Sequence, residues 1–150
     1  MTRLTLEPVS PGQIERLLPL IEAYYTHDSI PFKRERIQPV LDELLRTPTK
    51  GFAWLIQQHS LDVGYVIVTI GFDVEFGGPI AVITDLYIAP DFRAQGLGRA
   101  VMQQIEQACR ERQLTGLELQ VSVGNTRAQS FYERLGFRSH RRIPMSKQLR

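Results

Sequence analysis

Residues 89–112 read APDFRAQGLGRAVMQQIEQACRER, and this stretch decides the fold because it joins the end of a strand to a helix through a glycine-bearing loop. Val101, Ile105 and Ala108 recur at helical spacing, which predicts a helix from about Gly98 to Arg112. Backbone N–H groups at a helix start have no internal acceptor, and the helix dipole there favours negative charge. The loop is therefore a candidate seat for a phosphate group.

The loop alone leaves three interpretations open. A dinucleotide-binding fingerprint would need a third glycine or an alanine where Val101 stands. A P-loop would need lysine and then serine or threonine after the second glycine, whereas Arg99 and Ala100 follow it. The third interpretation is a plain strand–helix turn without a ligand, which is the more common meaning of an isolated Gly-x-Gly.

The remaining sequence predicts an α+β (α/β) fold with a mixed central sheet flanked by helices on both faces. Two helices are expected at the start, over residues 10–28 and 31–48, with Pro19 kinking the first or ending it early. β-branched and aromatic runs predict strands over 51–58, 62–72, 79–90 and 116–123, with a possible strand over 3–9. A short helix over 126–135, capped by Asn125 and Gly136, and a last strand over 139–149 complete the order.

Length and composition favour one soluble domain over residues 1–150. The 150 residues are 43% hydrophobic, enough for a sizeable core, and Cys109 is the only cysteine, so no internal disulfide forms. No secretory signal pattern and no run of 18 apolar residues is found, so we expect a cytoplasmic protein without a membrane span. The three histidines show no ligand-like spacing, so no metal is expected.

Charge is distributed unevenly along the chain. Residues 51–92 hold five acidic residues and no lysine or arginine, whereas residues 93–150 hold eleven basic and four acidic residues. The pattern is compatible with a nucleic-acid-binding basic third, with separate sites for an anion and a cation, or with scattered solvated charge.

Two further motifs extend the pattern of the glycine loop. The segment LYIAP at 86–90 precedes it, and NTRAQSFYERLGF at 125–137 follows it. With RAQGLG at 93–98, these segments resemble the acyl-CoA loop, the preceding strand and the later Asn-x-x-Ala-x-x-hydrophobic-Tyr segment of the GCN5-related N-acetyltransferase (GNAT) family. The resemblance covers essentially the whole chain in the expected order, and it implies that two middle strands splay apart.

The resemblance implies an acetyl-CoA site. The loop amides would hold the pyrophosphate, the strand backbone at Tyr87 and Ile88 would pair with the pantetheine arm, and Asn125 and Ala128 would lie along the CoA wall. The complete set of expected cofactor-binding residues is Leu86, Tyr87, Ile88, Arg93, Ala94, Gln95, Gly96, Leu97, Gly98, Arg99, Asn125, Ala128 and Phe131.

The expected reaction is direct transfer of the acetyl group to a primary amine in a ternary complex. The resemblance implies that Tyr132 protonates the departing thiolate. Asp85 and Glu75 are the candidate carboxylates to take the amine's proton, because a base must neutralise an ammonium before it attacks. Tyr24, Tyr25 and Asp28 fall in a segment that often borders the acceptor site in this family.

Other functions remain open at this point. A non-catalytic acyl-CoA-binding or regulatory module would share the same loop. A nucleic-acid-binding domain has no reader motif to support it, so no nucleic acid is expected as a partner. The acceptor stays unidentified, as a small amine or a protein amine, and relatives suggest a homodimer.

Overall fold

The computed structural model describes residues 4–150. The helices and strands follow in the order β1 (Leu4–Pro8), the 3-10 turn η1 (Pro11–Gln13), α1 (Ile14–His27), α2 (Arg34–Arg46), β2 (Gly51–Gln58), β3 (Leu61–Asp73), β4 (Gly78–Ile88), the 3-10 turn η2 (Pro90–Phe92), α3 (Leu97–Glu111), β5 (Gly116–Leu119) and α4 (Thr126–Arg134). Contacts group them into two compact units, residues 1–120 and 121–150, and each unit is described by itself. The expectation of a single domain stays a prediction.

The sheet of the first unit is mixed, as predicted, with strand order β1-β2-β3-β4-β5. The first four strands are antiparallel neighbours, because short turns connect β2 to β3 and β3 to β4. His59 and Ser60, both with positive φ, form the first of these turns. β5 runs parallel to β4, because α3 carries the chain back across the sheet between them.

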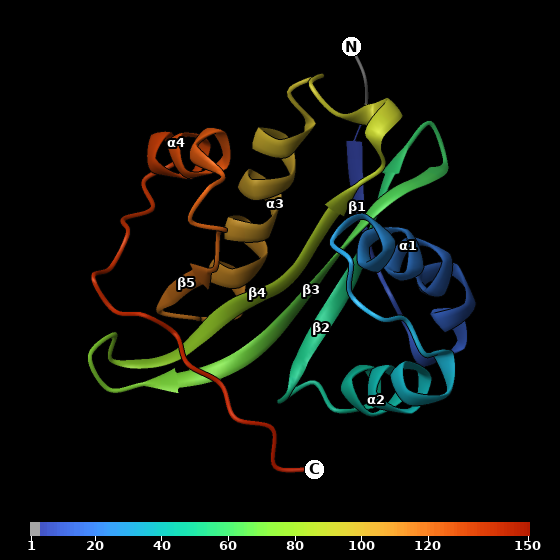
Figure 1. The fold of residues 1–150 in the computed structure, drawn as a ribbon, viewed down its shortest axis with the longest axis horizontal. Helices are drawn as coiled ribbons and strands as arrows, with labels where there is room; N and C mark the ends of the chain where they lie inside the picture. The colour runs from blue at the N-terminus through green and yellow to red at the C-terminus, as the bar shows by residue number, and fades with distance from the viewer. Residues whose placement is uncertain (1–3) are drawn as a thin grey trace. The chain divides into compact units, whose positions relative to one another are not determined.

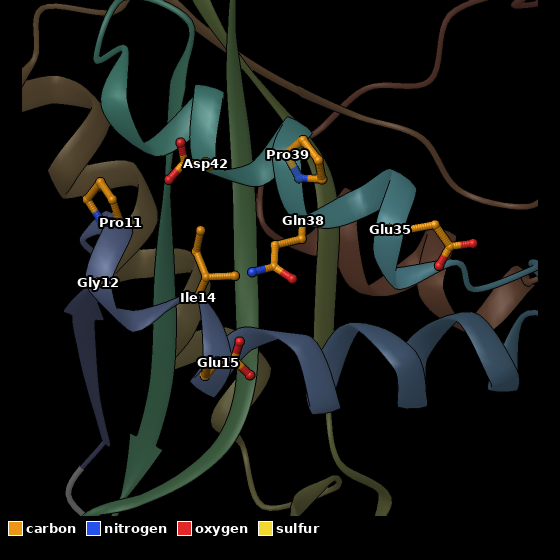
Figure 2. A pocket seen from close by; sticks show the side chains of 8 residues that line it. All are labelled: Pro11, Gly12, Ile14, Glu15, Glu35, Gln38, Pro39 and Asp42. Atoms are coloured by element: carbon orange, nitrogen blue, oxygen red, sulfur yellow. The ribbon is translucent and has the colours of Figure 1, made fainter.

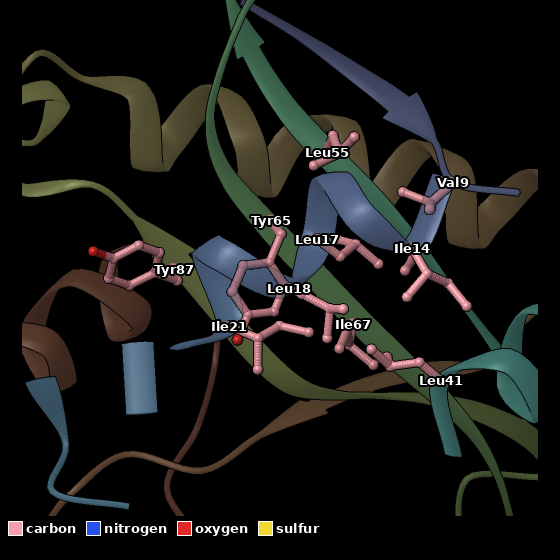
Figure 3. Close-up of a cluster of buried hydrophobic side chains, with 11 residues drawn as sticks. Val9, Ile14, Leu17, Leu18, Ile21, Leu41, Leu55, Tyr65, Ile67 and Tyr87 are labelled. Carbon is pink, nitrogen blue, oxygen red and sulfur yellow. The ribbon is translucent and has the colours of Figure 1, made fainter. Parts of the chain in front are cut away.

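Helices cover both faces of the sheet in this unit, with α1 and α2 on one face and α3 on the other (Figure 1). The α1 side is closed by a cluster of buried apolar residues in which side chains of α1 meet alternate residues of β2 and β3 (Figure 3). Tyr65 and Tyr87 belong to this cluster, so the same packing that stabilises the fold fixes these two rings. Across residues 4–150, no helix is long and apolar enough to cross a membrane.

Ser10 caps the first helical turn as predicted, but this turn is the 3-10 turn η1, and α1 begins at Ile14 and continues past Pro19. The Ser10 backbone N–H donates to Gln13 Oε1 at 2.9 Å, forming one half of a capping box. Pro19 lies inside the helix and does not end it early, because α1 runs on to His27. Pro19 lies on the exposed side of α1, where water can bind the carbonyl that loses its partner.

One predicted strand is shorter than expected, and another does not form. The strand predicted over 116–123 ends at Leu119, and residues 138–150 form no strand although one was predicted over 139–149. Pro144 cannot donate to a ladder, and Ile143 and Met145 are 84% and 92% exposed. Apolar alternation in this tail therefore exists without the burial that stabilises a strand.

A close backbone approach between β3 and β4 depends on Gly64. A Cβ atom at this position would lie 2.2 Å from the carbonyl oxygen of Tyr87 and 3.1 Å from the Cα of Ile88. A side chain here would force the strands apart, so glycine keeps the last part of β4 in register with β3. This part of β4 carries the predicted site.

Candidate active site

Asp85 lies on β4 among four tyrosine side chains. The Tyr65 hydroxyl donates to Asp85 Oδ2 at 2.8 Å from the neighbouring strand β3. Tyr65 and Tyr87 face each other in the β3–β4 register, with ring centroids 6.2 Å apart, and Tyr24 of α1 lies 6.4 Å and 6.0 Å from them. Tyr25 completes the group, 5.9 Å from Tyr24. We call Tyr24, Tyr25, Tyr65 and Tyr87 the tyrosine cluster.

The electrostatics of the cluster are unusual for a carboxylate on a strand. Burial raises the pKa of Asp85, and hydrogen bonds from Tyr65 and Thr84 act in the opposite direction. Burial, with the charges of Asp28 and Asp85, raises the pKa of Tyr24 to about 12. Tyr24 therefore stays protonated at neutral pH, and the proton affinity of Asp85 lies above that of an ordinary aspartate, as a general base requires.

The predicted acceptor contacts gather partly at this carboxylate. Tyr24 and Tyr25 belong to the tyrosine cluster, and the charge of Asp85 contributes to the raised pKa of both. Asp28 follows the end of α1 and pairs with His27, whose Nδ1 lies 2.9 Å from Asp28 Oδ1. Asp28 acts on the cluster through Tyr24, whose pKa its charge raises.

A bulge precedes Asp85 on β4. Ile67 of β3 faces Asp85 while Val68 faces Ile83, so Thr84 is an extra residue in β4. Pairing with β5 extends only from Ile80 to Ile83, at the same point. In the described part of the chain, the remainder of β4 pairs with β3 alone. Pairing between β4 and β5 thus ends at the bulge, and the expected splaying of the two strands stays a prediction.

The open edge of β4 beyond the bulge presents backbone groups. The Ala89 N–H donates to the Val63 carbonyl at 2.8 Å, so the peptide groups of Tyr87 also face β3, by strand alternation. Those of Leu86 and Ile88 face the opposite way, toward the edge where pairing with β5 has ended. The Tyr87 backbone, which was expected to pair with the pantetheine arm, is thus already paired with β3, and its role in cofactor binding stays a prediction.

Arg93 lies against this edge. Its Nε donates to the Ile88 carbonyl at 2.6 Å, and its guanidinium lies 5.5 Å from the Tyr87 ring centroid. The prediction had Arg93 flanking a phosphate. The structure places it on the strand edge, where it satisfies a carbonyl that the ladder leaves unpaired.

The glycine loop ends in a helix N-terminus. Gly96 caps α3 with φ 74°, a left-handed conformation, and a Cβ there would meet open space, so backbone conformation alone requires glycine. The first hydrogen bond of the helix joins the Ala100 N–H to the Gly96 carbonyl at 3.4 Å. The N–H groups of Leu97, Gly98 and Arg99 come before it and have no acceptor within the helix. The Leu97 side chain is buried and anchors this end of the helix.

A second side-chain contact ties the loop to the sheet, in addition to the bond from Arg93 to Ile88. Gln58, the last residue of β2 and a buried polar residue, donates from Nε2 to Gln95 Oε1 at 3.4 Å. Ala94 joins Gly96 in adopting positive φ, at 63°. Left-handed residues of this kind occur in the backbone turns whose successive N–H groups form anion-binding concavities.

The second unit holds the other predicted residues. Asn125 caps α4 as predicted, accepting at Oδ1 from the Ala128 N–H at 3.1 Å, and Gly136 follows the helix with φ 97°. Tyr132 packs between Phe131 and Phe137, with ring centroids 5.1 Å and 5.6 Å away. Burial raises the pKa of Tyr132, so its hydroxyl stays protonated at neutral pH.

Glu75 lies apart from Asp85. It is exposed in the turn between β3 and β4, where Asp73 pairs with Gly78. Asp85 lies seven residues after Gly78 along β4, a distance of about 23 Å at a rise of roughly 3.3 Å per residue. The two candidate carboxylates therefore do not share one site within this unit.

Tyr65 and Gln58 were missed by the sequence reasoning. Both lie inside predicted strands, where tyrosine and glutamine carry no signal of their own. The register pairs Tyr65 with Tyr87, so Tyr65 reaches Asp85, twenty positions away in sequence, diagonally across the two strands, and the Thr84 bulge shifts the register next to Asp85. From the sequence, strand alternation predicted only that Asp85 and Tyr87 lie on one face of the sheet, and the structure confirms this.

A separate cavity lies between the start of α1 and the side of α2 (Figure 2). Its volume is about 450 Å³, and its lining includes the carboxylates of Glu15, Glu35 and Asp42. Arg34 pairs with Glu15, and Arg46 pairs with Asp42 at 2.8 Å, so two of these charges are compensated. None of the predicted site residues lines this cavity.

Comparisons with solved structures agree with this architecture. An integron cassette protein from the mobile metagenome of Cole Harbour Salt Marsh is 26% identical with a TM-score of 0.85, covering 97% of this chain and 90% of that one. The aminoglycoside N-acetyltransferase AAC(6')-Iy, solved with CoA, has the same fold at a TM-score of 0.82 and 14% identity, covering 99% and 97%.

Sequence comparisons identify the family. An uncharacterized N-acetyltransferase of Methanocaldococcus jannaschii is 27% identical over 137 residues, which is 89% of this chain and 60% of that protein. A Bacillus subtilis protein provisionally named as an alanine N-acetyltransferase of ribosomal protein bS18 is 31% identical over 94 residues, or 63% and 58%. The matches thus span about 60% of the length of these relatives. The model of the acetyltransferase (GNAT) family matches residues 14–137, and the chain belongs to this family.

Proposed function

We propose that this chain transfers the acetyl group of acetyl-CoA to a primary amine by direct attack in a ternary complex. One observation carries the proposal. The β4 edge opens at Thr84, carries Asp85 beside the opening and leads through the glycine loop into the N-terminus of α3. A strand edge with unpaired peptide groups suits an amide-bearing arm, and a helix N-terminus suits a pyrophosphate.

The cofactor role follows from family membership and from these two features. GNAT enzymes use acetyl-CoA, and one structural neighbour was solved with CoA. We assign the amides around Gly96 and Gly98 to the pyrophosphate, and the Leu86 peptide groups and the Ile88 N–H to the pantetheine arm. An edge N–H here would donate to the thioester oxygen as it becomes an oxyanion.

The reaction balances without a covalent enzyme intermediate. The acceptor ammonium gives one proton to the Asp85 carboxylate, and the neutral nitrogen attacks the thioester carbon. The C–S bond then breaks as the amide forms, and the nitrogen releases its second proton to solvent. The thiolate takes a proton from Tyr132, which solvent restores, and Asp85 returns its proton to solvent. The products are the acetylated amine, CoA with a free thiol, and one proton.

Asp85 is our choice of base over Glu75. Asp85 is half-buried beside the open edge, and burial raises its pKa toward the working pH. Glu75 lies at the far end of the hairpin. The role of Tyr132 rests on the family motif, and burial, which raises its pKa, keeps the hydroxyl protonated at neutral pH. Tyr24 and Tyr25 are the proposed acceptor contacts, and the homodimer stays a prediction.

An amine panel tests the proposal by release of the CoA thiol from acetyl-CoA. The panel should include a peptide with N-terminal alanine and an aminoglycoside, because a relative and a structural neighbour are named for these acceptors. A lysine peptide and a diamine extend it to other primary amines. We expect amine-dependent thiol release with at least one acceptor class.

The competing outcome is equally measurable. If acetyl-CoA raises the melting temperature but no amine of the panel releases thiol, the chain is a non-catalytic acyl-CoA-binding module. Steeply salt-dependent binding of DNA or RNA, without stabilisation by acetyl-CoA, would instead support a nucleic-acid-binding protein.

A further inference from the structure

Tyr65 is buried and has a specific partner. Its side chain is 0% exposed within the core that joins α1 to the sheet, yet its hydroxyl reaches Asp85 Oδ2 at 2.8 Å. A core position of this kind is ordinarily filled by an apolar residue, because a buried hydroxyl must find an acceptor. Here the acceptor is the half-buried carboxylate beside the open edge of β4.

We propose that Tyr65 is a positioning residue for acetyl transfer, which holds one oxygen of Asp85 and leaves Oδ1 to receive the proton of the acceptor ammonium. The inference rests on the proposed function and adds to it a residue that no family motif in this sequence contains. In the step concerned, the N–H bond of the ammonium breaks, an O–H bond forms on Asp85, and Tyr65 keeps its own proton throughout.

The geometry explains why the hydroxyl is needed. Asp85 sits on a strand directly after a bulge, where backbone pairing is locally disrupted. A hydrogen bond from a ring that the core holds rigidly fixes the orientation of the carboxylate. The same bond stabilises the charged form and offsets part of the burial cost.

The groups that face Asp85 come from three elements. Tyr65 faces it from β3, Tyr24 and Tyr25 of α1 interact with its charge, and Thr84 lies beside it on β4. Among the described residues, no lysine, arginine or histidine contributes to the shifted pKa of Asp85. Tyr65 is therefore the strongest group that stabilises the carboxylate against protonation.

The test is a titration of the Asp85 side-chain carboxyl carbon by NMR, in the full chain and in Tyr65→Phe. The substitution keeps the ring in the core and removes one hydrogen bond to a charged group, so the midpoint should rise by about one to two pH units. The acid limb of kcat/KM against pH should move upward by the same amount. Tyr24→Phe is the matched control for the midpoint, because the charge of Asp85 acts on Tyr24, whereas Tyr24 is not among the groups that shift the pKa of Asp85.

The outcomes separate this inference from the proposed function. An unchanged midpoint in Tyr65→Phe overturns it, and so does a midpoint that moves while the acid limb stays in place. A midpoint shift as large in Tyr24→Phe as in Tyr65→Phe also overturns it, because the effect would then be general to the cluster. If the wild-type chain acetylates no amine, the proposed function fails, and with it the catalytic role of Tyr65, whatever the titration shows.

Discussion

Asp85→Asn should lower kcat for acetyl transfer by about 100-fold to 10,000-fold at pH 7, the range that general base catalysis contributes. Asparagine keeps the size of the side chain, and its amide oxygen can still accept from the Tyr65 hydroxyl. What it cannot do is take a proton from an ammonium. The loss should therefore fall on kcat, measured by thiol release, with little change in the affinity for acetyl-CoA.

The same substitution should raise the melting temperature at pH 7. Burial raises the pKa of Asp85, so the folded state favours the protonated form. The contribution of Asp85 to stability is therefore present below about pH 4 and is lost as pH rises through its raised pKa. Asparagine removes this buried charge, so its advantage should shrink as pH falls toward 4. Thermal melts at pH 4 and pH 7 measure the difference.

Glu75→Gln is the matched control for Asp85→Asn. Glu75 lies in the exposed turn at the other end of β4, so we expect kcat within about twofold of wild type, as for a surface change away from the site. If Glu75→Gln loses activity and Asp85→Asn keeps it, the assignment of the base to Asp85 is wrong. A fall in melting temperature for Asp85→Asn at pH 7 would contradict the electrostatic account.

Tyr132→Phe should lower kcat by about 100-fold, the lower end of what a general acid contributes. The ring contacts with Phe131 and Phe137 survive the change, so α4 should keep its packing. The hydroxyl that would protonate the thiolate is lost. We expect the loss in kcat at saturating acetyl-CoA, with its dissociation constant unchanged.

Stability separates this prediction from a structural effect. Thermal melts of Tyr132→Phe with and without acetyl-CoA should match those of wild type. A variant that keeps wild-type kcat across the pH range would remove Tyr132 from the mechanism. A variant that loses both kcat and acetyl-CoA binding would instead place the hydroxyl in the cofactor site.

Local patterns predicted most of the fold. Apolar runs bounded by turn residues located β2, β3 and β4, and Ser10, Asn125 and Gly136 marked helix ends through capping that acts within a few residues. Strand pairing was harder to predict, because it depends on residues that are distant in the sequence. The tail has the alternation of a strand, but Ile143 and Leu149 are exposed, and pattern alone cannot supply a partner.

The candidate site likewise has one part that local sequence predicted and one part that depends on strand pairing. The glycine loop and its helix were predictable because helix N-termini carry the same orphan amides in every protein. Strand register decides which peptide groups face the open edge, and the Thr84 bulge decides where that edge begins. Register also brings Tyr65 close to Asp85, so neither the direction of the β4 peptide groups nor the Tyr65 contact could be obtained from the sequence.

The most direct test of acetyl transfer in a ternary complex is the initial-velocity pattern with both substrates varied, using the most active amine of the panel. Direct attack requires acetyl-CoA and the amine to be bound together, so the double-reciprocal lines should intersect. Parallel lines, with acetyl-enzyme accumulating in the absence of amine, would show a covalent intermediate and contradict the account.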